Sequence, residues 1–308
     1  MRVPVVLIVF RRPELTKRVL KALQHSKPTK LYVIADGPRS GSETDESLVQ
    51  QTRALFDDLS WDCEVVREFS DTNLGLRERV LTGLDFVFAR EEFAIILEDD
   101  CVPNSSFFRF AEELLQKYER HQEIALVSAN NFGFVQRPSN SYFFSSHAHI
   151  WGWATWKRTW DEFRSNARER FVADISYQEI LDLIPTRGKR RAMEKMLQVE
   201  KTLDSWAINF SVFCYQNQKL VAVPKVNLAL NIGFGANSTH TKFESYADEI
   251  PAGEVRFPLR HPERLEANLW EMRKESLGKS LRWFTYPLVH PFDFIARVTR
   301  YFEILKSR

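Results

Sequence analysis

The sequence of 308 residues predicts an α/β fold built on a doubly wound, mostly parallel sheet. Short apolar runs alternate with helix-forming segments through the first 130 residues, and this alternation is typical of successive β-α-β units. The runs are continuously apolar, which favours strands buried on both faces. Hydrophobic residues make up 44% of the chain and charged residues 27%, which is enough for a substantial core.

Local signals place the elements of the first half in order. Val3–Phe10 is a continuous apolar run, and Pro13 opens the following helix because its fixed φ suits a first turn. The tripeptide Asn73–Gly75 marks the entry to a later helix, and Asn104 or Ser105 caps the next one. Further strands are expected at Leu31–Ala35, Cys63–Phe69, Phe93–Leu97 and Ile124–Ser128, with helices ending near Gln24, Leu59 and Arg120.

After about residue 130 this rhythm breaks. A short strand is expected at Tyr142–Phe144, and an aromatic cluster comes next at Trp151–Trp156. Arg187–Arg191 is expected to be a basic loop before a helix that carries Asp204 and Trp206. The small residues of Gly233–Thr241 predict a loop that can change its backbone conformation.

The net charge and the cysteine spacing bear on the partners and the cellular setting of the protein. A formal net charge of +2 gives no argument for a nucleic-acid partner. Cys63, Cys101 and Cys214 are widely spaced and lack a metal-ligand pattern, which favours a reduced, cytoplasmic setting. The first apolar run is too short to span a membrane, and Arg11-Arg12-Pro13 comes directly after it without a cleavage site.

The strongest chemical signal is Glu98-Asp99-Asp100 at the end of a predicted strand. Three consecutive carboxylates repel one another and are costly to desolvate. The carboxyl ends of parallel strands are also where open α/β sheets bind ligands. A divalent cation between these carboxylates and a diphosphate would neutralise both, and oxygen ligands suit Mg²⁺ or Mn²⁺. The alternative is a solvated acidic turn before the helix near Asn104.

The segment Ile95–Phe108 resembles the metal-binding segment of the vertebrate Golgi N-acetylglucosaminyltransferase I family. In both, an aliphatic strand runs into Glu-Asp-Asp, then a proline and a Phe-Phe pair. The segment also resembles bacterial sugar transferases related to that family, including some labelled hemolytic-protein-like. Over about residues 3–243 the same order is kept by Arg11-Arg12-Pro13, Ile34-Ala35-Asp36-Gly37, Asn73-Leu74-Gly75, Gly152-Trp153, Asp204-Ser205-Trp206, Phe234-Gly235 and Thr239-His240.

This resemblance implies a GT-A type fold of Rossmann-like character with a C-terminal acceptor-side extension. It implies transfer of a sugar from a nucleotide sugar, first UDP-N-acetylglucosamine among UDP-sugars, to a glycan or lipid-linked acceptor hydroxyl with inversion. The catalytic domain would cover residues 1–243, with a nucleotide-sugar-binding half at 1–130 and an acceptor-side half at 131–243. Residues 244–308 would form a linker and an aromatic, basic tail.

The resemblance also implies roles for single residues. Asp100 would hold Mn²⁺ or Mg²⁺, Asp99 would bond the donor ribose, and Glu98 would face the donor sugar. Asp204 matches the catalytic base, which takes the acceptor proton opposite the metal. This sequence has Ser205 where the family has a second aspartate. The remaining implied donor contacts are Arg12 and Asp36 at the nucleotide base, and Thr239 and His240 in a mobile loop over the diphosphate.

Three residues keep two interpretations. Arg79 could reach a phosphate or lie on an exposed helical face. Asp36 belongs to an Asp-Gly-Pro sequence that is also an ordinary turn. Trp153 could stack on a sugar ring or pack in the core, and Trp206 is assigned with it to the acceptor side.

Two other functions compete with glycosyl transfer. A sugar-phosphate nucleotidyltransferase shares the fold class but usually has a glycine-rich, basic loop after its first strand, and Arg11-Arg12-Pro13 contains no glycine. A non-catalytic carbohydrate-binding protein would use the aromatic residues but gives the acidic triplet no role.

The chain after Leu277 mixes aromatic and basic residues. Ile295, Val298 and Phe302 recur at helical spacing, which is typical of an amphipathic helix at a membrane surface. The tail therefore predicts peripheral membrane contact, against the alternative that it packs on the catalytic domain or on a second subunit.

Overall fold

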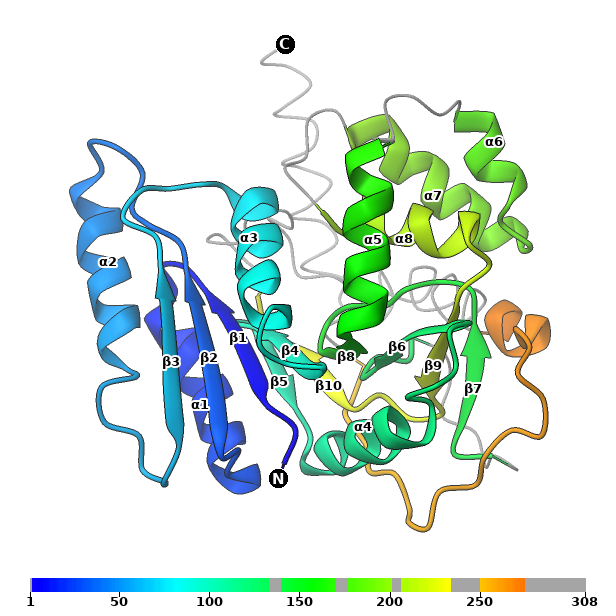
Figure 1. Cartoon of the computed structure of the whole chain (residues 1–308), viewed down its shortest axis with the longest axis horizontal. Helices are drawn as coiled ribbons and strands as arrows, with labels where there is room; N and C mark the ends of the chain where they lie inside the picture. The colour runs from blue at the N-terminus through cyan, green and yellow to red at the C-terminus, as the bar shows by residue number, and fades with distance from the viewer. Residues whose placement is uncertain (1, 133–139, 170–176, 201–205, 234–249, 275–308) are drawn as a thin grey trace, which may run out of the picture.

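The computed structural model describes residues 2–132, 140–169, 177–200, 206–233 and 250–274 (Figure 1). The elements in chain order are β1 (Val5–Val9), α1 (Pro13–Ser26), β2 (Lys30–Ala35), α2 (Glu43–Ala54), β3 (Glu64–Phe69), α3 (Leu76–Phe88), β4 (Phe93–Glu98), β5 (Cys101–Pro103), α4 (Ser105–Lys117), β6 (Ile124–Ser128), β7 (Tyr142–Ser145), β8 (Trp153–Trp156), α5 (Lys157–Glu169), α6 (Tyr177–Asp182), α7 (Arg187–Glu200), α8 (Ala207–Gln216), β9 (Leu220–Pro224) and β10 (Ala229–Asn231). The predicted strands and helices of the first half are confirmed, with ends that differ by a few residues.

The described strands form one mostly parallel sheet in the order β3-β2-β1-β4-β8-β6-β9-β7, and β5 and β10 form a separate pair. Strands β3, β2, β1 and β4 lie side by side in that order and run parallel to one another. Strands β6 and β9 are also parallel neighbours. Strand β8 is antiparallel to β4 and β6, and β7 is antiparallel to β9. The chain runs outward from β1 to β3 and returns to β4 on the other side of β1. The sheet is therefore doubly wound, with a switch point between β1 and β4.

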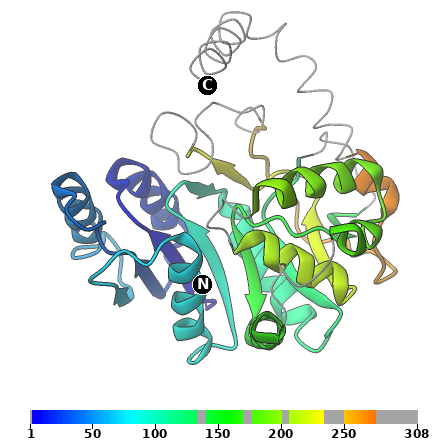
Figure 2. The same cartoon turned by 90° about the horizontal axis from the view of Figure 1, so that it is seen from above.

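Side chains of the central strands alternate between two cores. In β1, Val5, Leu7 and Val9 pack with α1 and α4, whereas Val6 and Ile8 pack with the group that contains α3, α5 and α8. Successive side chains of a strand point to opposite faces, so a continuously apolar strand needs cover on both. Helices on both sides of the sheet supply that cover (Figures 1 and 2). This arrangement confirms the predicted fold class.

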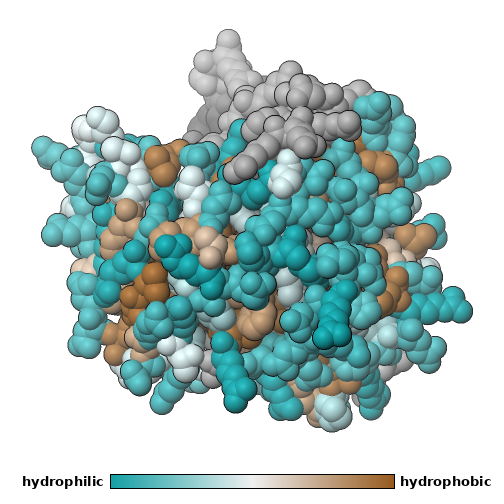
Figure 3. Space-filling view, in the orientation of Figure 1, coloured by the Kyte–Doolittle hydropathy of each residue, from teal (hydrophilic) through white to brown (hydrophobic). Residues whose placement is uncertain are grey.

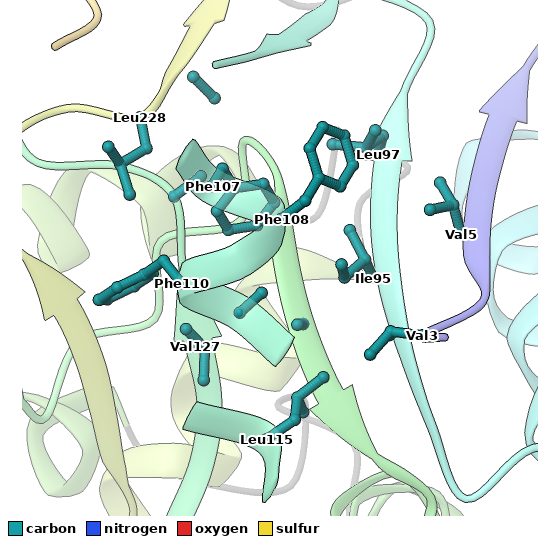
Figure 4. Close-up of a cluster of buried hydrophobic side chains, with 14 of the residues drawn as sticks. Val3, Val5, Ile95, Leu97, Phe107, Phe108, Phe110, Leu115, Val127 and Leu228 are labelled. Carbon is teal, nitrogen blue, oxygen red and sulfur yellow. The ribbon is translucent and has the colours of Figure 1, made fainter. Parts of the chain in front are cut away.

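Helix α4 covers one face beside the end of β4. Its Phe107 and Phe110 are fully buried, and Figure 4 shows them in one cluster with Leu97 of β4. Burial of each such side chain contributes about 1.5–3 kcal/mol. The predicted cap is also confirmed, because Asn104 Oδ1 accepts a hydrogen bond from the Ser106 N–H at 2.8 Å. The helix thus fixes the chain that leaves the acidic triplet.

The segment Arg187–Arg191, expected to be a loop, is the first turn and a half of helix α7. Met193 and Leu197 of this helix are buried against α6 and α8. The basic residues hid this helix because its first five residues include no apolar side chain. Among the described residues, α6, α7 and α8 share a small core of their own outside the sheet.

Residues 250–261 pack against the sheet and α4, where the sequence predicted a linker. The Val255 N–H donates to Ser106 Oγ at 3.2 Å, and the Arg260 N–H donates to Ser141 Oγ at 2.9 Å. Leu259 is buried in the same core as α4. A polar composition with Pro and Gly was misleading here because main-chain groups make many of the contacts.

The face seen in Figure 3 is mostly hydrophilic, with hydrophobic residues in small separate groups. Within the described parts of the chain, no helix is both long and apolar enough to cross a bilayer. The aromatic, basic tail lies outside the described residues, so its predicted membrane contact stays a prediction.

Candidate functional site

Three neighbouring strands end at one edge of the sheet. Strand β1 lies between β2 and β4, with Val9 opposite Ala35 and Ile8 opposite Glu98. This edge is at the switch point, where the chain connections leave a crevice. The residues that leave it are Arg12 after β1, Asp36 after β2, and Glu98, Asp99 and Asp100 at the end of β4. The register of the sheet thus brings these residues, which are far apart in the sequence, to the same edge.

Arg12 binds the last two carboxylates of the triplet. Its Nε donates to Asp99 Oδ2 at 3.2 Å, its Nη2 lies 2.7 Å from Asp99 Oδ1, and its Nη1 donates to Asp100 Oδ2 at 2.9 Å. The two aspartates are 2% and 7% exposed. Burial alone would lower the pKa of Arg12, but these carboxylates raise it overall, so the guanidinium stays charged. The resemblance placed Arg12 at a nucleotide base; in this structure its side chain lies on the triplet.

The triplet carries more negative charge than Arg12 can balance. Burial raises the pKa of both Glu98 and Asp99, and repulsion from Asp100 raises both further, while Arg12 opposes the rise. Like charges held close together in a poorly hydrated place disfavour one another's ionised form. A further cation would therefore stabilise the ionised triplet.

A short strand pair brings a second segment onto Asp100. Strand β5, which begins directly after the triplet, pairs with β10. The Ile232 N–H donates to the Asp100 carbonyl at 2.8 Å. A Cβ added to Gly233 would lie 2.0 Å from Asp100 Oδ2, so only glycine lets the chain pass there without a shift. The predicted loop Gly233–Thr241 therefore starts against the acidic triplet.

The Asp36 carboxylate, at the end of β2, accepts several hydrogen bonds from the protein itself. Its Oδ1 accepts from the Gly37 and Leu74 N–H groups, both at 2.9 Å. Its Oδ2 accepts from the Gly75 N–H at 3.1 Å and from Asn73 Nδ2 at 2.9 Å. A carboxylate has about four acceptor sites, and four donors fill them. The predicted contact of this carboxylate with a nucleotide base is therefore not supported; Asp36 fastens the loop before α3 to the sheet.

Replacement of Asp36 by alanine should lower the free energy of unfolding by about 3 kcal/mol or more, because several donors lose their acceptor at once. Urea denaturation measures this change. Asp71→Ala, in the exposed part of the same loop, is the matched control and should change stability little. Unchanged stability in Asp36→Ala with a loss of nucleotide binding would instead support the base contact that the resemblance implies.

Arg79 is buried in α3, at 4% exposure, and so lies on no exposed helical face. Its Nη2 donates to the Glu68 carbonyl at 3.3 Å and lies 3.3 Å from Glu68 Oε1. Its charge also acts to lower the pKa of Asp36, against the burial that raises it. Arg79 therefore ties α3 to β3, which contradicts the exposed-face interpretation, while its contact with a phosphate stays a prediction.

Trp153 and Trp206 are core residues. They are 1% and 2% exposed, and their rings stack on each other with centroids 5.5 Å apart. Phe210 and Trp160 complete the same aromatic cluster. Both indoles are buried against other aromatic rings, which does not support their predicted stacking on a sugar. Their role is to anchor the start of α8 on β8.

The sequence pattern did not predict a polar and aromatic cluster that forms around the chain before β8. Strand β8 pairs with β4 so that the chain before Trp153 runs toward Glu98. In that chain His149 contacts Phe132, with ring centroids 4.9 Å apart, and Phe132 contacts Trp151 at 5.0 Å. Lys189 of α7 lies with its Nζ 3.3 Å from His149 Nε2. The alternation His147-Ala148-His149-Ile150-Trp151 is the signal that could have indicated it.

Three predicted site residues, Asp204, Thr239 and His240, lie outside the described residues. Their roles as base and as donor contacts remain predictions. The structure does describe two residues near them in the chain, Trp206 in the aromatic core and Gly233 against Asp100.

No family model and no curated protein matches this chain. Similar solved structures include S. aureus TarS, with 12% identity over 74% of this chain and 59% of that one, at a TM-score of 0.42. The glycosyltransferase GlyE of Streptococcus pneumoniae is 10% identical over 57% of this chain and 41% of that one, at 0.30. A UDP-glucose pyrophosphorylase complexed with UDP-glucose is 10% identical over 54% and 80%, at 0.31. The chain therefore spans less than two thirds of the TarS and GlyE structures, and its function has to be inferred from the geometry of its own site.

Proposed function

We propose that this chain is a metal-dependent, inverting glycosyltransferase. It would move a sugar from a UDP-sugar, first UDP-N-acetylglucosamine, to a hydroxyl of a glycan or lipid-linked acceptor, with peripheral membrane contact through its tail. The observation that carries the proposal is the meeting of Arg12, Asp99 and Asp100 at the switch point between β1 and β4. A buried site with excess negative charge favours a cation together with an anionic ligand that shares it.

Asp100 fits a divalent cation that is held partly by the donor. Its carboxylate offers hard oxygen ligands of the kind that Mg²⁺ and Mn²⁺ prefer. In the part of the chain that the structure describes, no three His, Cys, Asp or Glu side chains are grouped to hold an ion. An ion at Asp100 would therefore take its other ligands from phosphate oxygens and water, as Mg²⁺ commonly does. When bound, it would stabilise the charge of the departing diphosphate.

The chain on either side of Asp100 supports the proposed donor contacts. Asp99 is held in one orientation by the two-point contact with Arg12, which suits a group that must orient a ribose hydroxyl. Thr239 and His240 come six and seven residues after Gly233, a length that spans at most about 25 Å when extended. We propose that this loop, which starts on the triplet at Gly233, closes over a diphosphate there.

Asp204 is the proposed general base. It precedes Trp206 by two residues, and the Trp206 ring is fixed against Trp153 of β8, the strand beside β4. Two residues span at most about 7 Å, so the proposed base would not be far from this aromatic core. An inverting transfer needs a base on the face of the sugar opposite the departing diphosphate.

The competing functions receive less support from the site. A nucleotidyltransferase usually has a glycine-rich phosphate-binding loop after its first strand, whereas the Arg11-Arg12-Pro13 segment after β1 contains no glycine. A carbohydrate-binding protein would need exposed aromatic rings, whereas Trp153 and Trp206 are buried.

A thermal-shift screen of nucleotide sugars, with and without Mn²⁺, tests the proposed function. A ligand that binds only the folded state raises the melting temperature by mass action. We expect a UDP-sugar to raise it in the presence of Mn²⁺ and to have little effect with a chelator. The absence of a shift with every nucleotide sugar would contradict the proposal.

Gly233→Ala should weaken Mn²⁺-dependent binding of the nucleotide sugar by about tenfold or more. The added methyl would collide with the Asp100 carboxylate and turn it away from its ligand. Calorimetric titration measures the affinity. Gly253→Ala is the matched control, because its Cβ would come no closer than 3.4 Å to a neighbour. Two variants with the same affinity as the wild type would show that the chain at Gly233 moves aside freely.

A further inference from the structure

Arg12 occupies the side of Asp100 that a cation would need. Its Nη1 donates to Asp100 Oδ2 at 2.9 Å, and the chain at Gly233 covers the same oxygen. The Cys101 thiol donates to the other oxygen, Asp100 Oδ1, at 3.4 Å. A thiol is a weak donor that a cation displaces easily, whereas a guanidinium is a full positive charge. Arg12 is therefore the group that competes with a cation for Asp100.

The attachment of Arg12 is asymmetric. Two of its nitrogens hold Asp99, at 3.2 and 2.7 Å, and a single nitrogen reaches Asp100. Two-point contacts between arginine and a carboxylate are stronger and better oriented than single ones. The Arg12 backbone is also fixed, because its carbonyl accepts from the Thr16 N–H at 3.0 Å and from Thr16 Oγ1 at 2.9 Å. Arg12 could thus release Asp100, stay on Asp99, and donate from Nη1 to a new anion.

The charges decide when this release is favourable. A divalent cation alone at Asp100 would lie close to the Arg12 guanidinium in a poorly hydrated place, where like charges repel strongly. A diphosphate that arrives with the cation adds negative charge between the two and accepts the released N–H of Arg12. The cation and the diphosphate should therefore bind better together than either binds alone.

We infer that Arg12 is a built-in counter-ion that makes divalent-cation binding depend on a nucleoside diphosphate. Without the diphosphate it neutralises Asp100; with it, Arg12 passes from Asp100 to phosphate while still holding Asp99. The inference rests on the proposed function, because it takes Asp100 as the cation ligand. Arg12 then acts as a positioning residue for Asp99 and as the gate of the cation site.

Electron paramagnetic resonance of free Mn²⁺ tests the inference on the full chain, with and without UDP and after subtraction of Mn²⁺ held by UDP itself. Wild type should bind Mn²⁺ alone weakly and about tenfold or more tightly with UDP. Arg12→Gln should bind Mn²⁺ alone about tenfold or more tightly than wild type, since one charge-assisted hydrogen bond no longer competes, and UDP should improve its Mn²⁺ binding less than it improves that of wild type. Arg11→Gln, which removes the neighbouring arginine from its ion pair with Asp45 at 2.9 Å, should behave as wild type.

Arg12→Lys separates charge from folding effects. It keeps a positive charge beside Asp100, so it should keep the weak binding of Mn²⁺ alone, even if Arg12→Gln proves unstable. Tight binding of Mn²⁺ alone by wild type or by Arg12→Lys, or unimproved binding by a folded Arg12→Gln, overturns the inference. A failure of the proposed function looks different: no variant, and not the wild type, would then bind Mn²⁺ or UDP under any condition, and the inference would fall with it.

Discussion

Asp100→Ala should abolish Mn²⁺-dependent binding of the nucleotide sugar while the protein stays folded. Asp100 ends the triplet at the switch point, and in the proposed function it is the main protein ligand of the cation. The fold should survive because the two-point contact between Arg12 and Asp99 remains and still neutralises the neighbouring carboxylate. Calorimetric titration of the donor with Mn²⁺ measures the loss, and circular dichroism checks the fold.

The matched control for Asp100→Ala is Asp45→Ala. Asp45 is a buried aspartate that pairs with Arg11 and Arg39 away from the triplet. Its removal breaks a buried ion pair of the same kind, and we expect donor binding to persist in the folded fraction. Undiminished turnover in Asp100→Ala would contradict its assignment as the cation ligand.

Asp204→Asn should keep donor affinity and lose sugar transfer by roughly a hundredfold or more. The change is nearly isosteric, but an amide cannot take the proton of the acceptor hydroxyl. The donor dissociation constant and the kcat for transfer, measured on the same preparation, separate the two effects. Ser205→Ala is the control: if the base is the single Asp204, removal of the neighbouring hydroxyl should change kcat little. A parallel fall of affinity and kcat in Asp204→Asn would make Asp204 a binding or structural residue instead.

Local patterns were sufficient to predict strands β1 to β4, β6 and β7, but not β8 in the middle of the sheet. The apolar run of β1 and the proline at the start of α1 are set by neighbours in the sequence, and both elements are confirmed. The capping residue Asn104 is local too, and its hydrogen bond is present. These signals need no knowledge of what lies across the fold.

The site depended on contacts between distant parts of the chain. No local signal reveals that Arg12 reaches over to Asp99, or that β10 returns to β5 and places Gly233 on Asp100. Asp36 was correctly predicted to follow the second strand. Its carboxylate, however, accepts hydrogen bonds from the loop before α3. An Asp-Gly-Pro sequence looks the same whether its carboxylate faces a ligand or the protein.

The burial of the aromatic residues was the hardest feature of the site to predict from the sequence. A tryptophan beside a glycine suits either a binding surface or a core, and only the packing of α8 on β8 decides between them. Trp153 and Trp206 pack on each other in the core, whereas Trp151, two residues before Trp153, is only half-buried.

Phosphorus NMR of the products formed from a UDP-sugar in the presence of Mn²⁺ tests the central claim most directly. A glycosyltransferase cleaves the bond between the sugar carbon and the diphosphate, so it releases UDP, slowly to water and faster to an acceptor hydroxyl. We expect UDP to accumulate in the wild type, to be absent in Asp100→Ala, and not to be replaced by UTP when pyrophosphate is added. Formation of UTP and a sugar 1-phosphate from pyrophosphate would show cleavage between the two phosphates, and would contradict glycosyl transfer in favour of nucleotidyl transfer.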